Sequence, residues 1–297
     1  MSPTRRAVLK GIAAVAVSAA AGVPGASARE RKVPPADAVG LLYDATRCIG
    51  CKACMVKCKE ANGLPPDTET PRGGIYDAPD DLNASTKNVI KLYRGADGRT
   101  SFMKSQCMHC VDPACASVCM ISAFHKGPRG IVSYDPDKCV GCRYCQLACP
   151  FNVPKYEWRT PFPKIVKCEL CRHLLDKGGI PACVESCPRE AVIFGALETL
   201  RADAKSRIAN EPGKYFPKVY GDTDGGGTQV LYLSAAGIPF DKLGLPDLGD
   251  EPIPELTESL QHGVYQGFIA PAVLYGILGL TVFRSWRRQR REEGSGE

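Results

Sequence analysis

The sixteen cysteines of this 297-residue chain form four motifs of four, with none left over. The motifs are Cys48, Cys51, Cys54 and Cys58; Cys107, Cys110, Cys115 and Cys119; Cys139, Cys142, Cys145 and Cys149; and Cys168, Cys171, Cys183 and Cys187. The first and third have the spacing C-x2-C-x2-C-x3-C. The second and fourth lengthen the middle gap but keep the opening C-x2-C and the closing C-x3-C. Thiols this regularly spaced constrain the fold strongly, because each motif has to bring its side chains to a shared ligand.

This spacing is typical of [4Fe–4S] clusters. In the bacterial ferredoxin motif, three thiolates hold one cubane and the fourth cysteine ligates the neighbouring cluster. Pro150 and Pro188 follow the third and fourth motifs, as in ferredoxins, whereas Lys59 and Met120 follow the first two. The sequence therefore predicts four [4Fe–4S] clusters held by all sixteen cysteines through iron, with fourth ligands exchanged between motifs.

Two other uses of clustered cysteines were weighed. Eight disulfides would also consume sixteen cysteines in an oxidising compartment, but cysteines at three-residue steps have poor geometry for bridging one another. Structural zinc needs two C-x2-C pairs and leaves a third cysteine at the same step unexplained. The spacing favours iron–sulfur clusters over both alternatives.

The N-terminus has the pattern of an export signal. Basic residues at Arg5, Arg6 and Lys10 precede a mild apolar stretch from residue 11 to 23, and Ala26-Ser27-Ala28 follows as a small-residue cleavage site. We interpret residues 1–28 as a twin-arginine signal peptide, with Val8 where that pattern prefers Phe. This route exports proteins already folded around their cofactors, so the thiolates would be committed to iron before they meet an oxidising compartment.

The C-terminal region has the pattern of a membrane anchor. Residues 264–283, VYQGFIAPAVLYGILGLTVF, carry no charge and would span roughly 30 Å as a helix, the thickness of a bilayer core. Five arginines follow in residues 284–297. The positive-inside rule then predicts a cytoplasmic C-terminus and clusters on the periplasmic side of the inner membrane.

Charge and composition exclude other function classes. Much of the formal net charge of +6 comes from the leader and the C-terminal arginines, so the body has no basic field for nucleic acid. No nucleophile with a paired base and no phosphate-binding glycine motif is visible. The chain is expected to lack a catalytic site of its own.

Short apolar segments between the motifs predict small strands. Residues 130–134, 191–195 and 228–233 are apolar and bounded by turn residues, and residues 200–209 are helix-like. Residues 61–88 are rich in Pro, Asp, Gly and Asn and predict an insertion loop. Short strands alternating with cysteine-bearing helices indicate an α+β fold.

Four segments resemble the four-cluster ferredoxin family, the electron-transfer subunits of respiratory molybdopterin and hydrogenase enzymes. They are CIGCKACMVKCKEAN, QCMHCVDPACASVC, CVGCRYCQLACPFNVPKYEW and KCELCRHLLDKGGIPACVESCP. The twin-arginine leader, the later segment KYFPKVYGDTDGGGTQVLYL and the single anchor most resemble the HybA-type subunit of membrane-bound [NiFe] hydrogenase 2. The beta subunit of formate dehydrogenase is the next resemblance; it normally lacks a leader.

The resemblance implies which motifs pair, the first with the fourth and the second with the third. The implied ligand sets are Cys48, Cys51, Cys54 and Cys187; Cys58, Cys168, Cys171 and Cys183; Cys107, Cys110, Cys115 and Cys149; and Cys119, Cys139, Cys142 and Cys145. The fold expected is two interleaved bacterial-ferredoxin-like dicluster units plus one C-terminal transmembrane helix. The outer unit would comprise 29–98 and 155–200, the inner unit 99–154, the connector 201–263, the span 264–283 and the basic tail 284–297.

The function implied is electron transfer between a [NiFe] hydrogenase, with its small and large subunits, and an integral membrane subunit that reacts with quinone or carries a cytochrome. A molybdopterin catalytic subunit, as in formate dehydrogenase, is the alternative partner. A zinc-stabilised, membrane-tethered scaffold is the alternative of another class.

Overall fold

The computed structural model describes residues 31–66, 79–158, 160 and 163–293. The expected signal peptide, residues 1–28, lies outside them, as does the middle of the expected insertion loop. Contacts divide the described chain into a body, residues 31–254, and a second unit that begins at Glu255. The two units are described separately.

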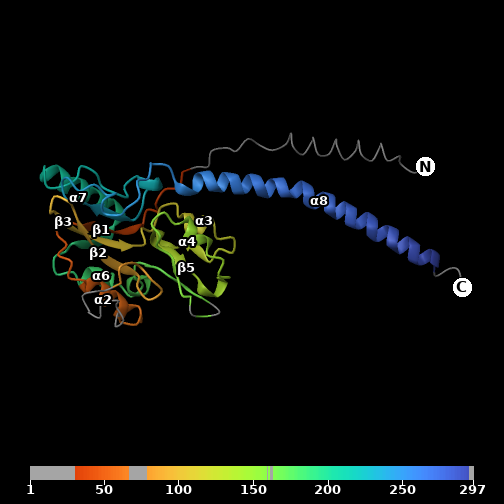
Figure 1. Cartoon of the computed structure of the whole chain (residues 1–297), viewed down its shortest axis with the longest axis horizontal. Helices are drawn as coiled ribbons and strands as arrows, with labels where there is room; N and C mark the ends of the chain where they lie inside the picture. The colour runs from red at the N-terminus through yellow and green to blue at the C-terminus, as the bar shows by residue number, and fades with distance from the viewer. Residues whose placement is uncertain (1–30, 67–78, 159, 161–162, 294–297) are drawn as a thin grey trace. The chain divides into compact units, whose positions relative to one another are not determined.

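A three-stranded sheet lies at the centre of the body (Figure 1). Its middle strand is β1 (Val39–Asp44), which pairs antiparallel with β8 (Val192–Ala196) and parallel with β9 (Val230–Leu233). β1 reads VGLLYD and is buried along nearly its whole length, as a central strand covered on both faces should be. The strands expected at 191–195 and 228–233 are thus present.

A long hairpin pairs β2 (Asn88–Arg94) with β3 (Thr100–Gln106). Its tip is closed by Gly98, whose φ of 80° suits glycine, and by a hydrogen bond from Gly95 N to Arg99 O. The boundary expected between the outer and inner ferredoxin-like units, residues 98 and 99, falls at this tip. It would therefore assign the paired strands β2 and β3 to different units.

Four helices carry cysteines and form two pairs. α2 (Ala53–Ala61) contacts α6 (Ala182–Glu185), and α3 (Ala114–Ser117) contacts α4 (Tyr144–Ala148). The remaining short elements are β4 (Phe124–Lys126), η1 (Pro128–Gly130), β5 (Val132–Tyr134), η2 (Pro136–Lys138), β6 (Lys155–Tyr156), β7 (Ile165–Val166), α5 (Arg172–Leu175) and η3 (Asp224–Gly226). β4 pairs with β5 and β6 with β7, both antiparallel. Helices of the first and fourth motifs therefore lie together, as do helices of the second and third.

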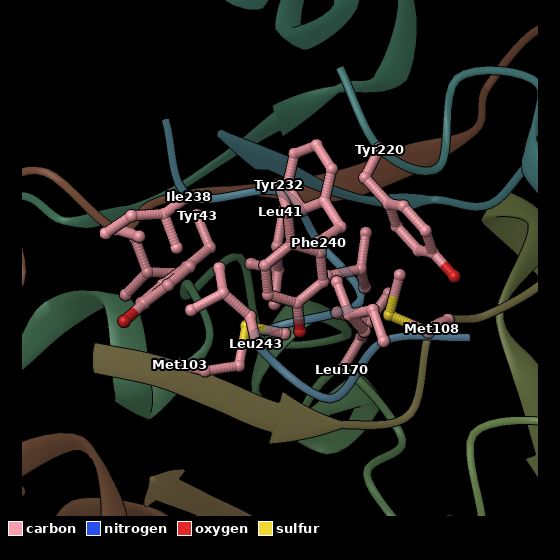
Figure 2. Packing of buried hydrophobic residues seen from close by; sticks show 14 of the residues in the cluster. Leu41, Tyr43, Met103, Met108, Leu170, Tyr220, Tyr232, Ile238, Phe240 and Leu243 are labelled. Carbon is pink, nitrogen blue, oxygen red and sulfur yellow. The ribbon is translucent and has the colours of Figure 1, made fainter. Parts of the chain in front are cut away.

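The main apolar core joins β1 and β9 to β3 and to the chain after β9 (Figure 2). Tyr43 meets Tyr232 edge to face with ring centroids 5.4 Å apart. Phe240 packs against Tyr220, 5.1 Å between centroids. On another side, α7 (Leu197–Asn210) packs Leu197, Leu200 and Ala204 against the sheet. Residues 201–252, expected as a connector, are therefore part of the body.

The second unit contains most of α8 (Ile253–Glu293), which includes Pro271. Residues 271–287 are all exposed. The large apolar side chains among them are Val273, Leu274, Tyr275, Ile277, Leu278, Leu280, Val282, Phe283 and Trp286. Among the described residues, no helix reaches both the length and the apolarity needed to span a membrane. The segment 264–283 is helical, but the expected transmembrane span is not confirmed.

Candidate iron–sulfur sites

The four opening C-x2-C loops share one backbone feature. In each loop, the residue just before the second cysteine has a positive φ: 70° at Gly50, 48° at His109, 75° at Gly141 and 50° at Leu170. The left-handed conformation costs non-glycine residues about 1–2 kcal/mol. Successive N–H groups around such a residue form a concave nest that binds anions, a geometry that recurs at iron–sulfur sites. The loops are thus shaped to hold an anionic group, which a cluster with four thiolates is.

The third cysteine of every motif is the second residue of a helix. Cys54 follows the start of α2, Cys115 that of α3, Cys145 that of α4 and Cys183 that of α6. The fourth cysteine comes four residues later, so it lies near the third on the same face of the turn. In α2 both thiols lie within the helix, whereas in the other three motifs the helix ends before the fourth cysteine.

The structure brings the sixteen cysteines into four groups, here named sites I to IV. Site I comprises Cys48, Cys51, Cys54 and Cys187; site II comprises Cys58, Cys168, Cys171 and Cys183; site III comprises Cys107, Cys110, Cys115 and Cys149; site IV comprises Cys119, Cys139, Cys142 and Cys145. In each group one thiol comes from a different motif than the other three, and the groups are named by the ligand sets that the family resemblance implies.

Site I is the clearest of the four, because its four cysteines line one pocket. Tyr43, Lys52 and Lys104 also line it. The Cys187 thiol accepts a hydrogen bond from the backbone N–H of Ala191, 3.3 Å away.

In site II, the other three thiols lie near Cys58. Burial raises the pKa of the Cys58 thiol to about 12, and the nearby thiols of Cys168, Cys183 and Cys171 act in the same direction. Cys168 accepts the backbone N–H of Leu170 at 3.4 Å. The left-handed turn at Leu170 thus also supplies a donor to a thiol.

In site III, Cys107 and Cys115 are buried, and Cys110 and Cys149 are partly buried. Burial raises the pKa of Cys107 to about 11, and it raises those of Cys110 and Cys115 further. The pKa of Cys149 is raised by burial as well, although the backbone N–H groups of residues 151–153 stabilise its thiolate and oppose the shift.

Site IV lies nearer the surface, where Cys142 is exposed. Burial raises the pKa of Cys145 to about 12, with Cys119, Cys139 and Cys142 adding to the shift. The Tyr156 hydroxyl lies 4.0 Å from the Cys139 sulfur. Arg143 stacks on the Trp158 ring, 3.9 Å from its centroid, beside these ligands.

The donor sets fit [4Fe–4S] clusters. Four thiols held together and largely buried disfavour the charged thiolate form, so a cationic iron–sulfide core is needed to stabilise it. The neutral His109 ring supports site III without being a ligand: its Nδ1 accepts the Val132 N–H at 3.1 Å, and burial holds its pKa well below the usual value. In the described part of the chain, no three His, Cys, Asp or Glu side chains are arranged to hold one metal ion.

Buried lysines are the feature that sequence reasoning largely missed. Lys167, just before the fourth motif, is buried and donates to the carbonyls of Val132 and Cys168. Lys104 is buried too, although a lysine in the strand TSFMKSQ gives no signal of burial. Lys57 and Arg172, also within or beside motifs, have side chains about half exposed.

Known proteins similar to this chain are iron–sulfur proteins. A family described as the 4Fe-4S dicluster domain matches residues 99–197, which hold the last three motifs. The hydrogenase-2 operon protein HybA of Escherichia coli O157:H7 is 40% identical over 90% of this chain and 91% of its own length. The chain belongs to the HybA-type family of iron–sulfur subunits. It is similar also to the formate dehydrogenase iron-sulfur subunit of Haemophilus influenzae, 34% identical over 87% of this chain and 83% of that protein. Membership identifies [4Fe–4S] clusters as its cofactors, and sixteen cysteines are consistent with four.

Proposed function

We propose that the chain is a membrane-anchored, periplasmic electron-transfer subunit with four [4Fe–4S] clusters, which passes electrons between a [NiFe] hydrogenase and a quinone-reactive membrane subunit. The observation that carries this proposal is the proximity of the cysteine thiols in four groups, each of which draws on two motifs. The hydrogenase partner is favoured by the 40% identity to HybA over nearly the whole chain.

When bound, each cluster accepts and donates one electron, and the protein fixes the spacing. Cys54 and Cys58 lie one helical turn apart on α2, so a single helix supplies thiols to sites I and II. The Cys107 thiol of site III is close enough to Cys168 of site II for the two to influence each other's charge. Sites I, II and III thereby follow one another, which suits tunnelling because its rate falls exponentially with distance.

Anchoring and export are supported by the sequence at the two ends. Residues 264–283 carry no charge, five arginines follow, and the side chains of residues 271–283 are exposed along α8. These features favour a single span with a cytoplasmic C-terminus. The leader pattern at residues 1–28 favours export of the folded protein.

The test uses the full-length protein with an affinity tag. We expect about sixteen iron atoms per chain, for four cubanes, and co-purification with a [NiFe] catalytic subunit. Hydrogen should then bleach the iron–sulfur absorbance of the purified complex, whereas formate should not. Zinc in place of iron would instead favour a structural scaffold and contradict the proposal.

A second candidate, the beta subunit of a formate dehydrogenase, rests on the 34% identity to such subunits. In the same experiment, it predicts a molybdopterin partner and bleaching by formate.

The anchor is tested separately by comparing chains that end at residues 263 and 283. The shorter chain should leave the membrane fraction and keep its iron, because the apolar run contributes no thiol. If the shorter chain stays in the membrane without its partners, the anchor lies elsewhere.

A further inference from the structure

Lys104 is a fully buried lysine on β3. Only 1% of its surface is exposed. Lysine is almost never buried to this degree unless it is paired with a countercharge. Its ammonium donates a hydrogen bond to the neutral Gln106 side chain. Within the described residues it forms no ion pair with a carboxylate.

The countercharges around Lys104 are thiols from two sites. The side chain lines the pocket of site I together with Cys54. Cys58, Cys168 and Cys183, the other thiols close enough to act on it, belong to site II. Lys104 therefore lies where sites I and II meet.

A second buried lysine has the same relation to site III. Lys167 is also buried, and it lies close enough to Cys107 and Cys115 to act on their charge.

We propose that Lys104 is a positioning residue for electron transfer, whose single buried charge is shared by the clusters of sites I and II and raises both midpoint potentials. The proposal rests on the cluster content proposed above. Reduction adds negative charge to a cluster, and a fixed positive charge in a medium of low dielectric constant stabilises that state more than the oxidised one. Because one ammonium serves both sites, it raises the two potentials together.

The experiment compares Lys104→Met, Lys104→Gln and Lys104→Arg in the full-length protein by redox titration monitored by electron paramagnetic resonance. Lys91→Met is the matched control. Lys91 is on the paired strand β2, but its side chain is 41% exposed and pairs with Asp81. Both Lys→Met variants remove one positive charge from the same hairpin, but only Lys104 is buried beside the cysteine thiols. Iron content is measured for every variant.

We expect Lys104→Met and Lys104→Gln to lower the midpoint potentials of two of the four clusters, with the other two unchanged. Lys104→Arg and Lys91→Met should leave all four close to wild type. If the uncharged variants lose the iron of sites I and II while Lys104→Arg keeps it, the buried charge is needed to hold those clusters, which supports the assignment.

Four unshifted potentials in Lys104→Met, an equal shift of all four, or a shift in Lys104→Arg as large as in Lys104→Met would overturn the role of Lys104. So would loss of iron in all three Lys104 variants. These outcomes leave the proposed function intact if the wild type shows four clusters, whereas wild-type protein without iron would overturn both proposals.

Discussion

Asp44 offers a sharp test of how the first motif is attached to the body. It ends β1, four residues before Cys48, and its carboxylate is buried with 1% exposure. One oxygen accepts Thr46 N–H and Oγ1–H at 3.0 and 2.6 Å. The other accepts the Tyr215 hydroxyl at 3.0 Å and the Arg207 Nη1–H at 3.2 Å. Asp44 therefore joins β1 to α7 and to the chain before β9.

The perturbation is Asp44→Asn, which keeps the shape but removes the charge. Breaking a buried ion pair costs about 3–5 kcal/mol. Arg207 keeps its second partner, Asp203, at 2.7 Å, so the lower end, about 3 kcal/mol, is expected. Since 1.4 kcal/mol is tenfold, this loss raises the local opening equilibrium by about a hundredfold.

Amide hydrogen exchange of the iron-loaded protein measures this opening directly. Peptides covering β1 and β9 should exchange about a hundredfold faster in Asp44→Asn. The control is Asp203→Asn, which removes the other carboxylate of Arg207; that carboxylate is 37% exposed and its pair contributes at most about 1 kcal/mol. Unchanged exchange in Asp44→Asn, or an equal effect in Asp203→Asn, would refute the reasoning.

Three further perturbations follow from the sites. Cys187→Ser should damage the cluster of site I and leave sites III and IV intact, as read by iron content and magnetic resonance spectra; damage confined to site II would contradict the interleaved assignment. Tyr156→Phe should lower the potential of site IV by about 20 mV, because a long hydrogen bond contributes about 0.5 kcal/mol and 59 mV corresponds to about 1.4 kcal/mol for one electron. An unchanged potential in redox titration would show that the hydroxyl does not act on Cys139. Burial raises the pKa values of thiols such as Cys54 and Cys58 to about 12, so cluster binding has to displace their protons. Acid favours the return of these protons. A chelator should therefore remove iron faster at about pH 6 than at about pH 8. Release independent of pH would argue against proton displacement.

The sequence was most informative where chemistry fixes spacing. Cysteine intervals predicted the family and the clusters, because a cubane accepts few arrangements of ligands. The strands at 191–195 and 228–233 were also predictable, because short apolar runs between turn residues have few other uses. Which site each cysteine serves needed the family resemblance, since spacing alone does not show which motifs pair.

Other features could not be read from the sequence, because they depend on contacts between distant residues. The parallel pairing of β1 with β9 joins Leu41 to Val230. The buried position of Lys104 depends on thiols contributed by the first and fourth motifs. The left-handed turns at His109 and Leu170 violate a local preference, and they are maintained because the ligand loop requires them.

The central place of β1 has a consequence for synthesis of the chain. β1 is the first strand of the body to leave the ribosome, but its neighbours β8 and β9 begin at residues 192 and 230. The ligands of sites III and IV all lie between residues 107 and 149, so they emerge as a complete set while β1 still lacks both partners. Sites I and II wait for residue 187, and the sheet beside them closes only when residue 233 has been made. The order of translation therefore favours filling sites III and IV before sites I and II. A nascent chain stopped before residue 233 leaves one edge of β1 unpaired, which distinguishes it from the complete body.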